Sequence, residues 1–269
     1  GRAAAPARVA ARAPAGLLAA MPGWVNGMLG CKLVSVFPEN ETHGRRGHQA
    51  LIALFEADHG EPVAILDGTA ITAMRTGLVS ALATRCLARS EARVLAVLGT
   101  GVQARSHLNA LPLVRRFVEI RVAGRNRTKA AALAAECGAS VASDFEAAVR
   151  GADVVCCCTH AAEPILRRAW LAPGAHVNSV GIGGRELDAA TIAAAEVLAV
   201  ESPVTFAPFP AGAHELQGVD PARGTELGVL LASVAPPPSR SLTVFKSVGH
   251  AVEDVAAAAW VWRATINAE

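Results

Sequence analysis

Residues 94–104 read VLAVLGTGVQA, an apolar run of strand length that passes into the spacing Gly-x-Gly-x-x-Ala. In such a strand-to-helix turn Gly99 allows the sharp bend, Gly101 lets the backbone approach a pyrophosphate, and Ala104 allows close helix packing. The first turn of the helix that follows would offer N–H groups to the phosphates. A plain tight turn can share this spacing, but the strand before it and the helix after it favour a dinucleotide-binding site.

After Ser90 the chain alternates apolar strands with amphipathic helices. Strands are expected at residues 93–98, 119–123, 153–159 and 176–180, and helices at residues 101–111 and 128–136. Continuous apolar strands that alternate with helices are typical of a parallel sheet covered on both faces. We therefore predict an α/β protein with a Rossmann-type parallel-sheet domain over residues 91–239.

The two ends of the chain are expected to form a second, α+β domain, from residues 1–90 and 240–269. Residues 32–37, 48–55 and 62–66 have the pattern of an antiparallel meander, and residues 69–87 have helical spacing. After the run Pro236-Pro237-Pro238, interpreted as a rigid linker, residues 243–247 predict a strand and 250–266 a helix.

Composition excludes several function classes. The 269 residues carry 25 basic and 23 acidic side chains, and this balance argues against a nucleic-acid partner. No apolar run approaches the roughly 20 residues that a membrane-spanning helix needs. The six cysteines and eight histidines show no metal-ligand spacing, and we interpret the run Cys156-Cys157-Cys158 as small core residues. We predict no metal, a small-molecule partner and a cytoplasmic location. The chain begins at Gly1 without a Met, which suggests that residues precede it.

The loop after the second strand of the parallel sheet decides which dinucleotide is preferred. An NAD site would carry an acidic residue there, whereas this loop reads Arg125-Asn126-Arg127-Thr128. Guanidinium groups match a phosphate with two hydrogen bonds, and cations at a helix start are unfavourable unless an anion joins them. The loop therefore predicts NADP(H), with NAD(H) as the less favoured cofactor and a solvated basic loop as the plain alternative.

Three further cations lie in apolar surroundings: Arg8, Lys32 and Arg75. A buried cation without a partner is costly, so an anion is expected to meet them. That anion could be a bound ligand. It could equally be a carboxylate of the chain such as Glu56 or Asp67, or the side chains could extend to the surface.

The sequence resembles the ornithine cyclodeaminase and mu-crystallin family in blocks that follow one another in family order. The blocks are Gly30–Val34, Asp67–Gly68 with Thr72–Thr76, Leu98–Ala104, Asn126–Thr128, Gly151–Val155, Pro173–Asn178 and Thr243–Asp254. The resemblance implies a Rossmann domain with a second domain from both chain ends, which binds substrate and forms a homodimer. It implies a clamp for the carboxylate of an amino or imino acid at Arg8, Lys32 and Arg75, with Val248 near the substrate.

The resemblance also implies cofactor contacts beyond the glycines and the two arginines. These are His48, Val102, Gln103, Asn126, Thr128, Thr159, Val180, Gly181 and Ser247. The cyclodeaminase branch carries a catalytic Asp after a late strand, whereas here that turn reads Val180-Gly181-Ile182-Gly183-Gly184 and lacks the Asp. The segment is several residues short, so either the loop is truly trimmed or some of its residues are missing from the sequence. Together with Arg125 and Arg127, this departure favours the NADPH-dependent ketimine reductase branch.

We therefore predict an NAD(P)H-dependent oxidoreductase that reduces imine or ketimine forms of α-amino acids, a ketimine reductase or an amino-acid dehydrogenase. Lys32 and Arg75 are the predicted catalytic residues, and Lys32 could also supply a proton if its pKa is lowered. Two alternatives stay open: an ornithine cyclodeaminase that releases ammonia, and a non-catalytic NADPH-dependent protein that binds small ligands.

Overall fold

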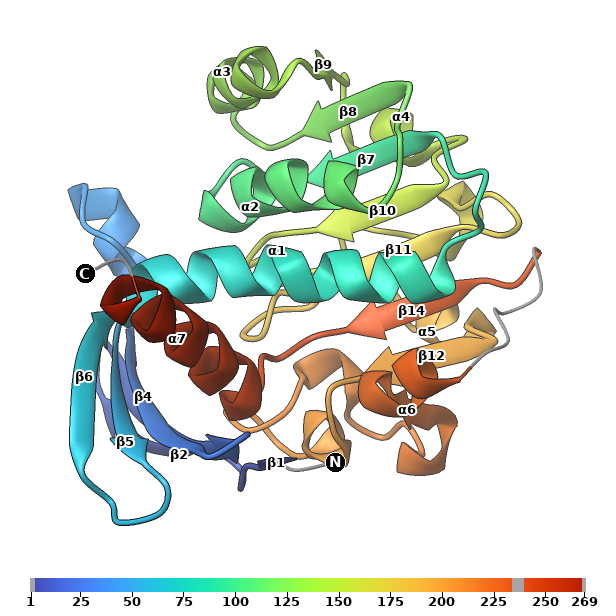
Figure 1. Cartoon of the computed structure of the whole chain (residues 1–269). Coiled ribbons are helices and arrows are strands. Elements are labelled where there is room, and N and C mark those ends of the chain that lie inside the picture. The colour runs from blue at the N-terminus through green and yellow to red at the C-terminus, as the bar shows by residue number, and fades with distance from the viewer. Residues whose placement is uncertain (1–2, 234–239, 268–269) are drawn as a thin grey trace. The chain divides into compact units, whose positions relative to one another are not determined.

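The computed structural model describes residues 3–233 and 240–267 of the chain (Figure 1). The chain divides into two compact units: unit 1 is Gly1–Arg75 with Gly249–Glu269, and unit 2 is Thr76–Val248. One boundary falls inside helix α1 (Gly68–Leu87). The predicted domain boundaries at residues 90 and 240 both lie inside unit 2. The predicted linker Pro236–Pro238 lies outside the described residues.

Unit 2 is built on a parallel sheet with the strand order β13-β12-β14-β11-β10-β7-β8-β9 (Figure 1). The strands are β7 (Val94–Leu98), β8 (Glu119–Ala123), β9 (Ser140–Val141), β10 (Val154–Cys157), β11 (His176–Ser179), β12 (Val197–Val200), β13 (Gly224–Glu226) and β14 (Thr243–Lys246). The helices are α2 (Val102–Ala110), α3 (Arg127–Cys137), α4 (Phe145–Val149), α5 (Ala189–Ala194), α6 (Leu227–Ala232) and the later part of α1. The predicted fold class is confirmed.

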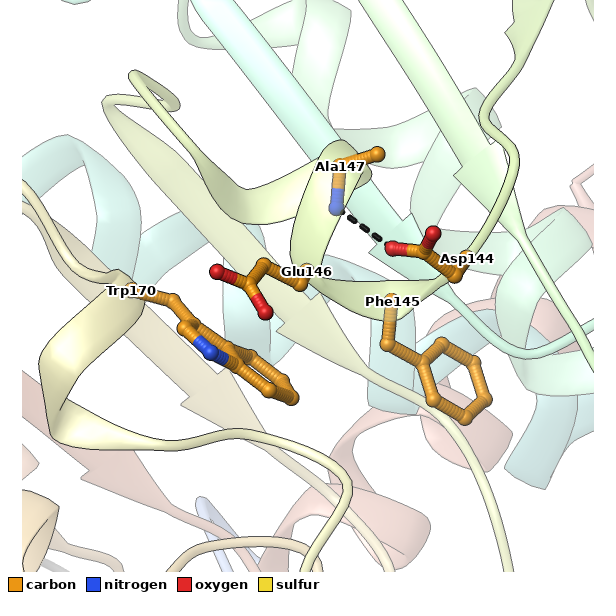
Figure 2. Close-up of a pocket in the computed structure, with 5 residues that line it drawn as sticks. All are labelled: Asp144, Phe145, Glu146, Ala147 and Trp170. Carbon is orange, nitrogen blue, oxygen red and sulfur yellow. Dashed lines mark hydrogen bonds between the residues drawn. The ribbon is translucent and has the colours of Figure 1, made fainter.

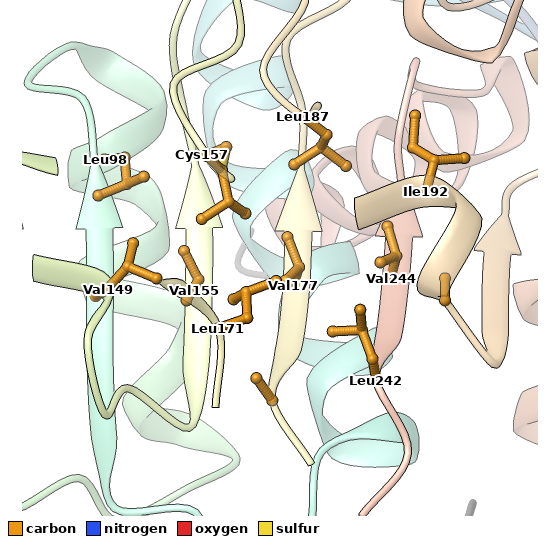
Figure 3. Close-up of a cluster of buried hydrophobic side chains, with 14 of the residues drawn as sticks. Leu98, Val149, Val155, Cys157, Leu171, Val177, Leu187, Ile192, Leu242 and Val244 are labelled. Carbon is orange, nitrogen blue, oxygen red and sulfur yellow. The ribbon is translucent and has the colours of Figure 1, made fainter. Parts of the chain in front are cut away.

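Two apolar cores cover the two faces of this sheet. On one face Leu98, Val155 and Val177 pack with Val149 of α4 and Ile192 of α5 (Figure 3). The other face carries a second core, formed by strand residues together with α2 and α3. Successive side chains of a strand point to opposite faces, which is why continuously apolar strands fit a sheet covered on both sides.

The cysteine run follows the same alternation. Cys157 belongs to the core of Figure 3, Cys156 and Cys158 belong to the core on the opposite face, and all three are buried. Burial raises the pKa of the Cys156 thiol to about 12. The prediction that these residues are core residues is therefore confirmed.

Unit 1 contains an antiparallel sheet with helix α7 (Ala251–Ile266) against β3, β4 and β5. The strands are β1 (Ala3–Ala4), β2 (Val9–Ala13), β3 (Gly16–Val25), β4 (Met28–Val36), β5 (His48–Glu56) and β6 (Pro62–Asp67). The predicted meander corresponds to β4, β5 and β6. The first three strands were not predicted, because β3 is rich in Ala and Gly and contains Pro22, residues that are depleted in strands.

Two fully buried histidines of unit 2 are held in the neutral form. His107 contacts the Gln103 carbonyl oxygen at 2.7 Å and Ser80 Oγ at 2.8 Å, and His176 contacts Thr243 Oγ1 and Asn178 Oδ1. For each ring these partners fit one donating and one accepting nitrogen. Burial is the main cause that lowers the pKa of both histidines to about 4.

We expect acid to destabilise the fold through these two histidines. Because their pKa values are lower in the folded than in the unfolded chain, the unfolded chain binds more protons between about pH 6.5 and pH 4. The free energy of unfolding should fall across this window, by about 3 kcal/mol for each histidine. Urea denaturation at a series of pH values measures this loss. A His107→Gln variant should show a smaller fall, and an unchanged slope would contradict the assignment.

Candidate active site

The glycine-rich turn after β7 has the geometry of a pyrophosphate site. Gly99 has φ +127°, and a Cβ atom there would lie 2.4 Å from the Cys158 carbonyl oxygen, so only glycine fits. A Cβ atom at Gly101 would meet nothing within 4 Å, and no side chain caps the N-terminus of α2. The buried Oε1 atom of Gln103 has no hydrogen-bond partner among the described residues. Open space and helix N–H groups fit a dinucleotide phosphate, whereas the Gln103 oxygen could only accept from a donor such as a hydroxyl group.

The loop after β8 presents two arginines at the start of α3. Asn126 Oδ1 accepts a hydrogen bond from the Lys129 N–H at 2.9 Å, so Asn126 caps this helix. Arg125 and Arg127 are exposed, and Arg127 Nη1 donates to the Ser143 carbonyl oxygen at 3.4 Å. The loop from Arg125 to Thr128 holds no carboxylate, so its chemistry fits a phosphate group.

The remaining predicted cofactor residues of unit 2 follow β10, β11 and β14. They are Thr159, Val180, Gly181 and Ser247. Since β8, β7, β10, β11 and β14 are consecutive in the sheet, their carboxyl ends place all of these residues, together with the glycine-rich turn and the arginine loop, along one edge. That edge is where doubly wound sheets bind dinucleotides.

Unit 1 holds a buried cluster of charges built from β4, α1 and α7. Lys32 Nζ lies 2.7 Å from Asp254 Oδ2, Arg75 Nε lies 2.8 Å from Asp254 Oδ1, and Arg75 Nη1 lies 3.0 Å from Glu253 Oε2. The residues Lys32 and Arg75 are only 2% and 6% exposed, so neither side chain extends to the surface. The partners within the chain are Asp254 and Glu253 rather than Glu56 or Asp67. Sequence alone gave no reason to pair residues so far apart.

Gly249 links Arg8 to this cluster. Arg8 Nη2 donates to the Gly249 carbonyl oxygen at 2.6 Å. Gly249 has φ +73°, and a Cβ atom there would lie 2.7 Å from Arg75 Nη2. Any larger residue would therefore displace the Arg75 guanidinium. The structure places Arg8, Lys32 and Arg75 in one cluster.

The electrostatics of the cluster make Lys32 a candidate for proton transfer. Burial, and then the positive charge of Arg75, lower the pKa of Lys32 to about 8, although Asp254 acts in the opposite direction. Burial alone would raise the pKa of Asp254, but Arg75 and Lys32 hold it below its ordinary value. A lysine with a pKa near 8 can exchange a proton close to neutral pH.

Two predicted site residues, His48 and Val248, lie in a different unit from the residues with which they were grouped. His48 is the first residue of β5 in unit 1, whereas the other predicted cofactor residues are in unit 2. Val248 ends unit 2, whereas the three cations are in unit 1. The Val248 N–H donates to Glu201 at 3.1 Å.

A surface pocket elsewhere on unit 2 contains none of the predicted site residues. Asp144, Phe145, Glu146, Ala147 and Trp170 line a pocket of about 450 Å³ around the short helix α4 (Figure 2). Figure 2 shows the Asp144 carboxylate hydrogen-bonded to the Ala147 N–H, where it caps α4.

Within residues 3–233 and 240–267, no group of His, Cys, Asp and Glu side chains could hold a metal ion. No described helix is long and apolar enough to cross a membrane.

The profile of the ornithine cyclodeaminase/mu-crystallin family matches residues 1–268. The chain belongs to this family. The resemblance of the sequence blocks is thereby confirmed. This family member is 39% identical over 254 residues to the ketimine reductase mu-crystallin of Mus musculus, covering 92% of this chain and 80% of the relative.

Two solved structures share the fold of this ornithine cyclodeaminase/mu-crystallin family member. The Delta(1)-pyrroline-2-carboxylate reductase of Thermococcus litoralis, in complex with NADH and L-proline, matches with a TM-score of 0.91 and 30% identity. That match covers 99% of this chain and 88% of the other. An archaeal alanine dehydrogenase dimer with bound NAD matches with a TM-score of 0.87 and 28% identity, over 99% and 87% of the two chains.

Several buried or partly buried charged residues at the carboxyl edge were missed by the sequence reasoning. Glu186 accepts hydrogen bonds from Thr159 and Gly181, Glu201 accepts one from Ser247, and Lys246 pairs with Glu215. A signal existed for Lys246, because it interrupts an apolar strand as Lys32 does. Glu186 lies two residues after Gly184, the last residue of that turn, where nothing in the sequence distinguishes it from a surface residue.

Proposed function

We propose that this family member is an NADPH-dependent reductase of imines that carry a neighbouring carboxylate. The observation that carries the proposal is the cluster of the buried Lys32 and Arg75 with the partly buried Arg8, because cations so placed suit a small acidic ligand. The predicted class, an NAD(P)-dependent oxidoreductase acting on C–N bonds, is confirmed by relatives that reduce ketimines and pyrroline-2-carboxylate.

The contacts of the cluster support a carboxylate clamp. Asp254 pairs with both Lys32 and Arg75, and Glu253 pairs with Arg75. The paired acids hold the cations in place before the substrate arrives, so the binding geometry is preorganised.

The three cations of the clamp have two roles in the proposed reaction: Arg8 and Arg75 position the substrate, and Lys32 also transfers a proton. When bound, the reduced cofactor supplies a hydride to the imine carbon next to the carboxylate. Arg8 and Arg75 orient the carboxylate, and Lys32 Nζ donates the proton that the imine nitrogen gains. The C=N bond is thereby reduced to CH–NH, and the lowered pKa of Lys32 supports this role.

The preference for NADPH over NADH is proposed from the loop after β8. Arg125 and Arg127 lie at the start of α3 without a carboxylate between them, an arrangement that suits the 2′-phosphate. His48, Val102, Gln103, Asn126, Thr128, Thr159, Val180, Gly181 and Ser247 are the further proposed cofactor contacts, with Gly99 and Gly101 in the turn.

One assay separates the reductase from the two alternatives. Purified protein is mixed with NADPH or NADH and a panel of cyclic and acyclic imino acids, and the absorbance of the reduced cofactor is followed. Steady oxidation of NADPH supports the reductase. Release of ammonia from ornithine without net cofactor change would identify a cyclodeaminase, and tight ligand binding without turnover would identify a binding protein.

We also propose a homodimer, because the sheet of unit 1 leaves an apolar face uncovered. Even-numbered residues of β4 face α7, whereas Leu29 and Leu33 point the other way and are 40% and 44% exposed. Leu51, paired with Leu33 across the strands, and Leu18 are also exposed. An exposed apolar patch of this kind marks a protein interface, and a second copy supplies a matching face.

The cytoplasmic location is a further proposal, supported by the six free cysteines.

Leu33→Glu should convert the proposed dimer into a single chain. The substitution places a charge in the centre of the apolar face, where an interface would have to bury it. Light scattering at micromolar concentration should give the mass of two chains for the unmodified protein and of one chain for the variant. Leu113→Glu, at another exposed leucine in unit 2, should keep the mass of two chains. A mass of one chain for the unmodified protein would contradict the proposal.

A further inference from the structure

A buried network of charges lies at the carboxyl ends of β10, β11 and β14. Glu186 and Lys246 are fully buried, and the side chain of Glu215 is 2% exposed. Ser179, at the end of β11, contacts all three: its Oγ lies 2.8 Å from Glu186 Oε2, 3.0 Å from Glu215 Oε1 and 3.0 Å from Lys246 Nζ. None of these four residues belongs to the proposed substrate clamp or is a proposed cofactor contact.

Glu186 joins the turns that follow two neighbouring strands. Its Oε1 accepts hydrogen bonds from the Thr159 N–H at 2.6 Å and from Thr159 Oγ1 at 3.0 Å. Its Oε2 accepts from the Gly181 N–H at 2.8 Å and is also within reach of Ser179 Oγ. The Thr159 and Gly181 groups are donors, as an ionised carboxylate requires, and the single hydroxyl proton of Ser179 can go to either Glu186 or Glu215. Both Thr159 and Gly181 are proposed cofactor contacts, so Glu186 holds the backbone on which they depend.

Lys246 and Glu215 form the other half of the network. Lys246 Nζ lies 2.7 Å from Glu215 Oε1 and donates to the Gly181 carbonyl oxygen at 2.6 Å. Glu215 Oε2 accepts a hydrogen bond from the Glu186 N–H at 2.7 Å, so the Glu215 side chain is bonded to the backbone of the residue that carries the other carboxylate. With two carboxylates and one ammonium at their usual charges, the network carries one net negative charge.

The position of this charge in the sheet is informative. A doubly wound sheet binds a dinucleotide across its switch point, here between β7 and β10, with one nucleotide on each side. The arginine loop after β8 lies on one side and suits the adenosine phosphate. The strands β10, β11 and β14 on the other side therefore correspond to the nicotinamide half.

We propose that Glu186, with Glu215 and Lys246, is a positioning element that favours the oxidised, positively charged nicotinamide over the reduced, neutral ring. The inference rests on the proposed function, since it needs an NAD(P) cofactor at this edge. A net negative charge stabilises positive charge that develops as hydride leaves the ring. It would therefore lower the cost of oxidising the bound cofactor.

Glu186→Gln is the decisive variant, because it keeps the shape of the side chain and removes its charge. The ratio of the dissociation constant of NADP⁺ to that of NADPH should rise by roughly tenfold, the factor that Coulomb's law gives for one charge over about 10 Å at an effective dielectric constant of about 20. Glu186→Asp keeps the charge and should leave the ratio within about twofold of the unmodified protein. Both constants are measured by equilibrium titration without substrate.

The control is Asp153→Asn, which removes a buried carboxylate at the opposite edge of the same sheet. Asp153 accepts hydrogen bonds from the N–H groups of Arg93 and Val94 at 2.6 and 2.9 Å, so this variant should lose stability but keep the ratio. If Glu186→Gln weakened both cofactors equally, the charge would have no role and the inference would be wrong. Should that variant not fold, Glu215→Gln makes the same change in charge, and an unchanged ratio there would equally overturn it. Failure of the unmodified protein to bind either cofactor would instead refute the proposed function.

Discussion

Arg75→Met should lower kcat/KM for imine reduction by more than 100-fold. Removing one partner of a buried, hydrogen-bonded charge pair costs about 3 kcal/mol, which corresponds to a factor of that size. Arg75→Lys should lose part of the same efficiency, because lysine keeps the charge but cannot bind a carboxylate with two parallel hydrogen bonds. Steady-state kinetics with NADPH and a cyclic imino acid measures both losses.

The structure also changes what Arg75→Met should do to stability. A clamp of like charges alone would repel itself, and its loss would leave folding unaffected. The structure gives a different expectation, because Asp254 lies between Lys32 and Arg75 and is fully buried. Without Arg75, this carboxylate keeps Lys32 as its partner and loses part of its compensation, so the variant should also unfold more easily.

Arg89→Met separates the two effects. Arg89 pairs with the buried carboxylate of Asp153, in unit 2 and outside the proposed clamp. This variant should lose stability as Arg75→Met does, yet keep kcat/KM within about twofold. If Arg75→Met, assayed below its unfolding temperature, kept normal kinetics, Arg75 would be a structural residue only and the clamp would have to be abandoned.

Sequence patterns predicted best those elements whose local signal and tertiary role agree. The strands β7 and β10 of unit 2 are apolar throughout because both faces of the sheet are covered there, so their pattern is clear in the sequence. β12 (Val197–Val200) is equally buried but was missed, since its four residues lie within a stretch rich in alanine. β3 was missed for a different reason. Its stability comes from pairing along its length with β4, which no local propensity reports.

One part of the candidate site could be predicted from local sequence and another part could not. The glycine-rich turn and the arginine loop are continuous in sequence, so their chemistry could be inferred from their residues. The charge cluster could not, because Lys32 and Arg75 meet acids that follow them by more than 170 residues. Only the antiparallel sheet and α7, which begins just after Gly249, bring these side chains together.

Arg127→Ala should raise the dissociation constant of NADPH by about 10- to 100-fold and leave that of NADH nearly unchanged. Hydrogen bonds to charged groups contribute about 1.5–3 kcal/mol, and only NADPH carries the 2′-phosphate that would accept them. Arg127 is the first residue of α3, where a cation is unfavourable unless an anion binds. The substitution should therefore leave stability unchanged or slightly raise it. Arg125→Ala should have the same selectivity with a smaller effect.

Arg150→Ala provides the matched comparison for Arg127. Arg150 is also an exposed arginine of unit 2, but it pairs with Glu146 and precedes β10, at the edge of the sheet opposite the proposed cofactor site. Fluorescence titration of Arg150→Ala should give unchanged constants for both cofactors. The NADPH preference should also weaken with added salt, because ions screen an exposed phosphate–guanidinium contact. Equal weakening of NADPH and NADH by Arg127→Ala would show that the loop only supports the fold, and the NADPH assignment would then lose its physical basis.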